Sequence, residues 1–344
     1  MRLFAAIFVL FAHSFALTGN GGAYVSGMIY KIFRVPDFGG FGVNIFFILS
    51  GFLIMMSYDR CALNKNGDAK YLKNRALRIL PALYATLLLS SLVYGPLLTT
   101  FDLPRYFSDK DFWLYLCNVT LLPLNFFQVL PGVFPNNPYT SAINGSLWTI
   151  TVETAFYIMI LLIGIIKQHK NKTLILAGFA FTTIIYALAD TETFITNRYI
   201  LLTSRLLIPF VLGMLAYMYR DKIRLNVKLA VISLAGLLLC FRIFGSDGHI
   251  LACVFLAYLL LFLGLKKQWR VSRLLSKAGD FSYGVYVYAF PVQQITVDLF
   301  LRKGVAVSQS ANFFISLSFT LVLAILSWHF IEKKFLKFKH SRLT

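Results

Sequence analysis

Apolar residues follow one another along this chain in long runs that charged residues rarely interrupt. A helix needs about twenty such residues to cross the roughly 30 Å hydrocarbon layer of a bilayer. About ten stretches meet this requirement, and each is predicted to form a transmembrane helix: residues 3–18, 40–58, 79–99, 146–166, 173–189, 200–219, 226–244, 249–265, 281–301 and 312–331. The pattern therefore predicts an all-α membrane protein, a polytopic bundle of about ten transmembrane helices.

A further apolar stretch, residues 112–130, contains Asn118, Pro123 and Asn125. A straight spanning helix would have to accommodate the proline and both amides within hydrocarbon. We therefore predict an interfacial or re-entrant segment here instead of an eleventh span. The following residues, PGVFPNNP, are turn formers and predict a loop outside the membrane.

Basic residues divide unevenly between the predicted loops. If the N-terminus is cytoplasmic, the loops predicted to lie inside carry most of the 33 Lys and Arg residues, and the outer loops carry few. This bias follows the positive-inside rule, and an eleventh span at residues 112–130 would invert every later loop. We therefore predict that both termini lie in the cytoplasm and that residues 1–344 form a single integral membrane domain.

Composition agrees with a membrane protein, because 58% of the residues are hydrophobic and only 14% are charged, against about a quarter charged in soluble domains. A nucleic-acid partner for the net charge of +19 would need a basic stripe on a solvated domain, and no such domain is predicted. Membrane lipid headgroups or a phosphorylated cosubstrate at the cytoplasmic face suit this charge better. The four cysteines lack paired metal-ligand spacing, so neither a metal site nor a disulfide framework is predicted.

Few ionisable residues fall within the predicted spans, and burial in hydrocarbon makes each a candidate for function. His13 ends the opening run MRLFAAIFVLFAH, which could also be read as a cleaved secretory signal. Counted from Arg2, His13 lies roughly 16 Å into the bilayer. Counted in the same way from the outer ends of their own spans, Glu153 and Arg205 fall about 10 Å below the outer surface. His13 and Glu153 are therefore expected at a similar depth.

A histidine held by a carboxylate is a plausible general base, so we predict catalytic roles for His13 and Glu153. The alternative is structural: His13 bonds to a neighbouring helix, and Glu153 pairs with Arg205. Equal depth does not by itself establish that these side chains meet.

Arg75 and Arg78 lie one helical turn apart before Pro81. Two guanidinium groups at this spacing share a helix face and can grip phosphates, and Arg2 is predicted at the same membrane surface. The alternative is that they are ordinary positive-inside residues.

The predicted second span contains Ser50 among several glycines, and its ordinary interpretation is close helix packing. Asn144 and Trp148 precede Glu153 at a membrane boundary, where tryptophan usually anchors a helix but can also stack on a sugar ring. We predict that Ser50, Asn144, Trp148 and Arg205 contribute to substrate binding.

Taken together, the motifs of this chain resemble the acyltransferase-3 family of integral membrane acyltransferases. The resemblance covers essentially the whole chain, and five ordered motifs carry it: Arg2 with His13, GVNIFFILSGFLI at 42–54, RALRILP at 75–81, NGSLWTITVE at 144–153 and FSYGVYVYAFPVQQ at 281–294.

This resemblance implies transfer of an acyl group, most often acetyl from acetyl-CoA, to a sugar hydroxyl. It implies a catalytic role for His13 and an association of Arg2, Arg75 and Arg78 with the acyl-CoA donor on the cytoplasmic side. The NGSLWT form is similar to the branch that modifies bacterial lipopolysaccharide O-antigen or related glycans, which implies residence in the inner membrane. No metal cofactor is expected.

This chain departs from the family pattern at two positions. Many relatives have a histidine where this chain has Ala289, so that position supplies no acid or base here. Met1 also directly precedes Arg2, whereas relatives usually carry a few more residues.

Two other classes of function remain open from the sequence. A transporter or flippase would also use intramembrane His, Glu and Arg, although no repeated halves or paired interrupted helices are visible. A catalytically silent relative that serves as a partner subunit would be compatible with Ala289. The sequence also leaves open whether His13 acts as a base or carries the acyl group.

Overall fold

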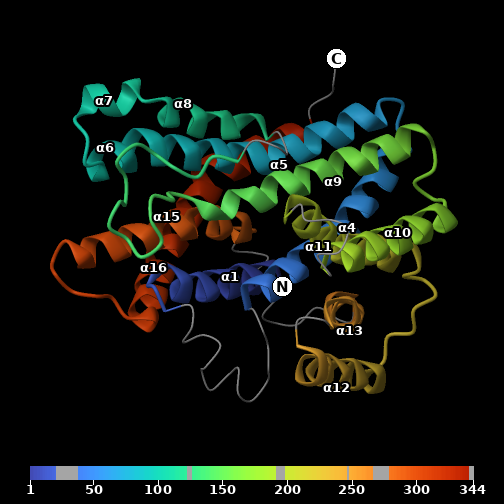
Figure 1. Ribbon diagram of the computed structural model, residues 1–344. Coiled ribbons are helices and arrows are strands. Elements are labelled where there is room, and N and C mark those ends of the chain that lie inside the picture. Colours follow the sequence, from blue (N-terminus) through green and yellow to red (C-terminus); the bar gives the residue numbers. More distant parts are fainter. Residues whose placement is uncertain (21–37, 122–125, 191–197, 246–247, 266–278, 341–344) are drawn as a thin grey trace. The chain divides into compact units, whose positions relative to one another are not determined.

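Helices make up nearly all of the regular structure in the computed structural model of this protein (Figure 1). The structure describes residues 1–20, 38–121, 126–190, 198–245, 248–265 and 279–340. Within these ranges there is no strand, only a single β-bridge between Val129 and Ala142. The all-α prediction is therefore confirmed for the described residues.

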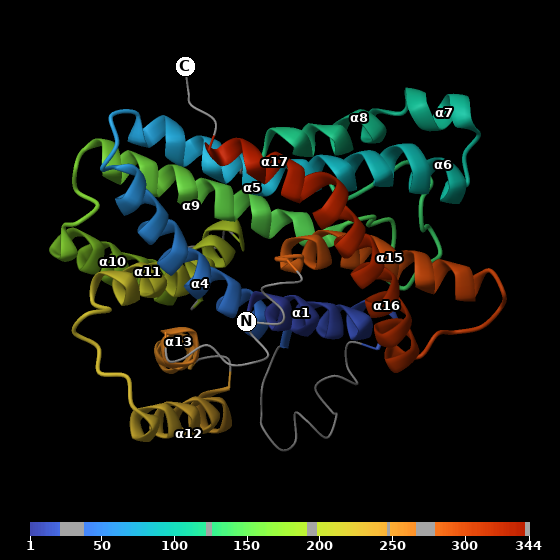
Figure 2. The same cartoon turned by 180° about the vertical axis from the view of Figure 1, so that it is seen from behind.

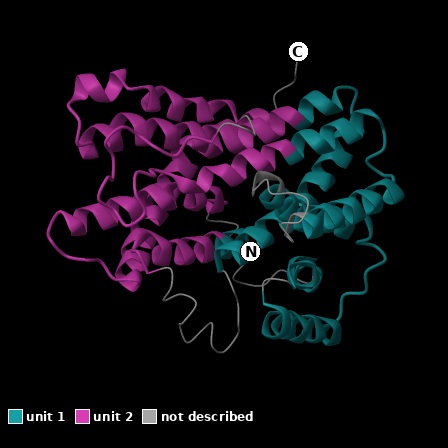
Figure 3. Cartoon of the chain, viewed as in Figure 1, with its two compact units in different colours: residues 1–5, 27–71, 156–278 teal, residues 6–26, 72–155, 279–344 magenta. Residues whose placement is uncertain are grey.

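The chain packs as two compact units, each built from three separate stretches (Figure 3). Unit 1 comprises residues 1–5, 27–71 and 156–278, and unit 2 comprises residues 6–26, 72–155 and 279–344. Neither unit is contiguous in sequence. Helices α1 (Arg2–Leu17), α5 (Gly67–Leu89) and α9 (Trp148–Ile165) each contribute residues to both units.

Among its described residues, unit 1 contains five further helices, which are α4 (Phe38–Cys61), α10 (Lys172–Asp190), α11 (Arg198–Met218), α12 (Val227–Phe244) and α13 (His249–Leu265). Helices α4 and α11 touch through their backbones. A Cβ at Gly51 would lie 1.9 Å from the carbonyl oxygen of Phe210, and one at Gly213 would lie 2.1 Å from that of Ile48. Close helix packing at Gly51 is thus confirmed, because no side chain fits there.

Unit 2 contains the remaining helices of the part of the chain that the structure describes. They are α6 (Gly95–Leu98), α7 (Leu103–Ser108), α8 (Lys110–Leu116), α15 (Ser282–Leu301), α16 (Gln309–Ser327) and α17 (Lys333–Lys337), with π-turns at Ser90–Tyr94 and Trp328–Glu332. Helix α15 is the core of this unit, since most of its residues are buried.

Each of the ten predicted spans coincides with a helix, but the count of ten spans is not confirmed. Six described helical segments are both long and apolar enough to cross a membrane: Phe38–Cys61, Gly67–Leu98, Gly145–Ile165, Leu201–Met218, Val227–Phe244 and Gln309–Lys337. Three shorter apolar helices are Arg2–Leu17, Lys172–Leu188 and His249–Leu265. The protein is therefore a helical membrane protein by the length and composition of its helices.

The stretch at residues 112–130 does not form one long helix. Helix α8 ends at Leu116, a short 3-10 turn follows over Cys117–Thr120, and Leu121 takes a left-handed conformation. Residues 126–144 then run as loop, while residues 122–125, which include Pro123 and Asn125, lie outside the described residues. The prediction that this stretch is not a straight span agrees with the described part.

Two adjacent glutamines of α15 attach other segments of unit 2 to this helix. Gln293 donates from Nε2 to the carbonyl of Leu10 on α1 at 2.9 Å. Gln294 donates from Nε2 to the carbonyls of Tyr139 and Ala142, both at 2.8 Å. Because both glutamine side chains are fully buried, these bonds fix α1 and the loop at 126–144 against α15.

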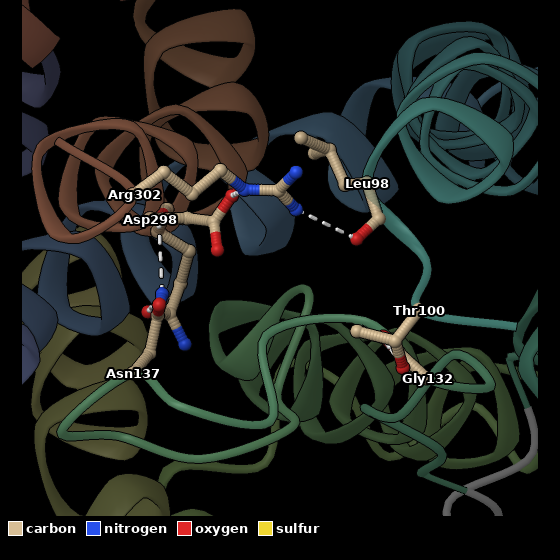
Figure 4. Close-up of polar contacts among 7 residues, drawn as sticks. Leu98, Thr100, Gly132, Asn137, Asp298 and Arg302 are labelled. Carbon is tan, nitrogen blue, oxygen red and sulfur yellow. Dashed lines mark hydrogen bonds and ion pairs between the residues drawn. The ribbon is translucent and has the colours of Figure 1, made fainter.

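The same loop is also held near the end of α15 (Figure 4). Asn137 donates from Nδ2 to the side-chain oxygen of Gln294 at 2.9 Å. Arg302 donates from Nε to Asp298 at 2.7 Å and from a terminal nitrogen to the carbonyl of Leu98 at 3.0 Å. The buried contact of Asn137 thus anchors the loop predicted to lie outside the membrane, while Arg302 attaches the end of α15 to Leu98.

Candidate active site

His13 and Arg2 lie on one continuous helix, α1. Eleven residues separate them, so they are roughly 16 Å apart along the axis and only about 20° apart around it. The two side chains therefore project from the same face of α1. His13 is half-buried.

The imidazole of His13 packs on the ring of Phe290, a residue of α15. The ring centroids are 5.2 Å apart and the planes are nearly perpendicular. Phe290 is itself almost fully buried, with Leu17 and Ala142 in the same apolar cluster. The edge-to-face contact therefore determines where the imidazole lies relative to α15.

A proline in α15 creates the attachment point for the NGS segment. Pro291 lacks the N–H that would bond to the carbonyl of Val287, four residues earlier. Asn144 supplies the missing donor, since its Nδ2 bonds to that carbonyl at 2.9 Å. Its Oδ1 accepts from the backbone N–H of Ser146 at 3.2 Å and so caps the turn at Gly145–Leu147.

Gly145 lies directly against the ring of Phe290. A Cβ there would be 2.7 Å from a ring carbon of Phe290. The sequence Asn-Gly at 144–145 therefore meets two requirements at once, a donor for Val287 and no side chain beside Phe290. Gly145 and His13 therefore both lie against Phe290.

Glu153 approaches α15 one turn from Phe290. Its carboxylate interacts electrostatically with Tyr286, which lies four residues before Phe290 on α15. The hydroxyl of Tyr286 also bonds to Thr149 and donates to the carbonyl of Ser146 at 3.3 Å. His13 therefore packs on α15 at Phe290, and Glu153 acts electrostatically on Tyr286 one turn earlier on the same helix. The role of Glu153 in orienting His13 stays a prediction.

Substituting Gly145 with alanine tests this arrangement. The new methyl group would push the ring of Phe290 and thereby displace His13 from its position. Because small displacements of a reacting group are costly, we expect the rate of the reaction in which His13 is predicted to act to fall roughly tenfold or more. Activity per folded molecule is the measurement, and an unchanged rate would contradict the proposed role of Phe290.

Arg78 on α5 forms an ion pair with Asp280, directly before α15. A terminal nitrogen of Arg78 donates to Asp280 at 2.7 Å, and the Arg78 side chain is only 13% exposed. A guanidinium carries five N–H donors, so this pair leaves capacity for further acceptors such as phosphate oxygens. Arg75 lies one turn earlier on the same helix.

The four residues predicted to bind substrate lie on three helices and in the segment before α9. Ser50 is buried beside Gly51 in α4, and Asn144 is buried with its amide bonded as described above. Arg205 lies on α11, where its carbonyl is 3.2 Å from Nε2 of His249. Trp148 begins α9 and is half-exposed.

Sequence reasoning assigned no role to Phe290, Tyr286, Asp280, Gln293 or Gln294, although all but Asp280 belong to the motif FSYGVYVYAFPVQQ. The sequence does contain a signal for the two glutamines, because Gln293 and Gln294 are adjacent amides that follow Pro291 in an apolar stretch. Among the described residues, no group of three or more His, Cys, Asp or Glu is arranged to hold a metal ion.

Comparisons with known proteins show what this chain is similar to. The sequence profile of the acyltransferase-3 family, described as an acyltransferase domain, matches residues 1–329. The chain is similar to an O-acetyl transferase of Shigella phage Sf6, with 30% identity over 347 residues that cover 100% of this chain and 96% of the relative. It is also similar to nodulation protein 10 of Rhizobium leguminosarum bv. viciae, with 27% identity over 364 residues that cover 99% and 93%. No solved structure matches it.

Proposed function

Because this chain belongs to the acyltransferase-3 family and is an O-acetyltransferase, we propose that it moves an acetyl group from cytoplasmic acetyl-CoA to a hydroxyl of a bacterial surface glycan. The glycan is lipopolysaccharide O-antigen or a related lipid-linked polysaccharide. The protein resides in the inner membrane with both termini in the cytoplasm, in the orientation that the distribution of basic residues favours.

One observation carries this proposal. Arg2 and His13 project from one face of a single helix, roughly 16 Å apart. A phosphate group needs a cation at the membrane surface, and a thioester needs a base or nucleophile at depth. The pantetheine arm of CoA separates the same two groups, so the order of Arg2 and His13 along α1 suits a donor that lies along this helix.

The chemistry assigned to His13 balances in either form. As a base, Nε2 or Nδ1 of His13 takes the proton of the acceptor hydroxyl while the hydroxyl oxygen attacks the thioester carbonyl. The C–S bond breaks, an O–C bond forms, and the imidazolium returns the proton to the CoA thiolate. As a carrier, a ring nitrogen attacks the thioester carbonyl, so that an N–C bond forms, the C–S bond breaks, and the leaving thiolate takes the N–H proton of the ring. The acceptor hydroxyl then attacks the acetyl-imidazole, so that an O–C bond forms, the N–C bond breaks, and the hydroxyl proton returns to the ring.

The acceptor enters from the outer side, past Trp148 and the loop at residues 126–144. The contacts of Gln294 and Asn137 support this path, because they hold the loop in a defined position beside the segment that touches Phe290. A rigid loop can present a polysaccharide in one orientation to the reacting group.

The proposal is tested by mass spectrometry of surface glycans from cells with and without this chain. We expect an added acetyl mass on one sugar only when the chain is present. Purified protein in detergent, supplied with acetyl-labelled CoA and the same glycan, should transfer the label. A transporter or flippase would leave both the glycan mass and the label unchanged, and that result would overturn the proposal.

A further inference from the structure

A lysine near the C-terminus accompanies the two arginines of α5. Lys339 lies in the 3-10 turn that follows α17. Its ammonium interacts electrostatically with the guanidinium groups of Arg75 and Arg78 and with the carboxylate of Asp280. In Figure 2, α17 is drawn across α5, and about 260 residues of sequence lie between Arg78 and Lys339.

A short segment before and inside α15 holds the C-terminal region in this place. Gly279 has φ +116° and packs so tightly on Trp328 that a Cβ would lie 2.1 Å from the indole nitrogen. A Cβ at Gly284 would lie 3.4 Å from Oε1 of Glu332. Because Asp280, between them, pairs with Arg78, α5 and the turn at Trp328–Glu332 are both attached to the same segment.

Basic and acidic side chains gather at this place. Arg75, Arg78 and Lys339 are accompanied by Asp280, which is half-exposed, and by Glu332, which is 2% exposed and already accepts from Ser327 at 3.2 Å. Burial and the two neighbouring guanidinium groups lower the pKa of Lys339. An ammonium is thus placed where its charge is unfavourable, and a bound polyanion would offset that cost.

We propose that Lys339 is a third cation of the donor site and that Arg75, Arg78 and Lys339 together hold the phosphate groups of acetyl-CoA. This inference rests on the proposed function, since it requires acetyl-CoA as the donor. The two arginines offer forked donors to phosphate oxygens, and the lysine adds a compact charge from a separate element. The C-terminal turn is therefore part of the binding site.

The test compares Lys339→Gln with Lys337→Gln in the full-length protein. Lys337 is exposed and lies two residues before Lys339. Lys337→Gln removes the same charge as Lys339→Gln, so it is a matched control. We expect Lys339→Gln to raise the KM for acetyl-CoA about tenfold or more, as expected for loss of a charge-assisted bond. The kcat should change little, Lys339→Arg should recover most of the affinity, and Lys337→Gln should match the unchanged protein.

Lipid headgroups also carry phosphate, so the measurement is made in nanodiscs of phosphatidylcholine and of phosphatidylglycerol. The same rise in KM in both lipids supports the proposal. A rise confined to phosphatidylglycerol, or equal effects of Lys339→Gln and Lys337→Gln, would overturn it in favour of lipid binding or general charge.

Direct binding of CoA by calorimetry separates this inference from the proposed function. If the unaltered protein binds CoA but Lys339→Gln binds it equally well, the lysine has no role while the donor assignment stands. If the unaltered protein neither binds CoA nor uses acetyl-CoA, the proposed function fails and this inference with it.

Discussion

Replacing His13 with alanine is expected to reduce acetyl transfer by about a hundredfold to ten-thousandfold, the range that a positioned acid or base contributes. The reason is that both forms of the proposed chemistry require a ring nitrogen at this place. The structure leaves the imidazole half-buried against Phe290, neither fully exposed nor sealed. The measurement is the initial rate with labelled acetyl-CoA, normalised to folded protein.

The adjacent Ser14→Ala variant is the control for this experiment. Ser14 is buried on the same helix, but its hydroxyl donates locally to the carbonyl of Phe11 at 2.6 Å. We expect its rate to stay within about twofold, since a local helix bond contributes only modestly. A His13→Ala protein with full activity would remove His13 from the mechanism.

Replacing Gly51 with valine is expected to cause the largest loss of stability. The Cβ of any residue at this position would lie 1.9 Å from the carbonyl oxygen of Phe210, and a backbone atom cannot rotate away. Helices α4 and α11 would have to separate, at a cost of about 3 kcal/mol or more. Thermal unfolding in detergent, followed by size-exclusion chromatography, should show a lower Tm and less folded protein.

Gly178→Val on α10 is the matched control, because a Cβ at Gly178 would meet nothing within 4 Å. We expect its stability to change by less than about 1 kcal/mol, the scale of helix propensity alone. Equal Tm values for the two valine variants would show that the α4–α11 backbone contact does not limit stability.

The helices themselves could be predicted well from the sequence. Long apolar runs place α1, α4 and α12 within a few residues of their observed ends. The interruption around Asn118 marks where a helix stops, and Gly51 marks a close helix contact. These features depend on a residue and its near neighbours, which is why a local pattern is sufficient.

The partners of the candidate site could not be predicted in the same way. The depth count put His13 and Glu153 at a similar level but said nothing about their neighbours in the membrane plane. The structure shows that α15 is the element both of them approach, through Phe290 and Tyr286. Asn144 donates to the carbonyl of Val287, which Pro291 leaves without its helical donor. The sequence does not reveal this contact, because the two segments are far apart along the chain.

The sequence by itself determined the helical class, the apolar segments and the family, because hydropathy, turn formers and ordered motifs are read along the chain. Only the tertiary structure decided which residues meet. Arg78 pairs with Asp280 across 202 positions, and Gln293 reaches Leu10 across 283. Such contacts arise from how helices pack in three dimensions, and helix packing joins residues that no local pattern connects.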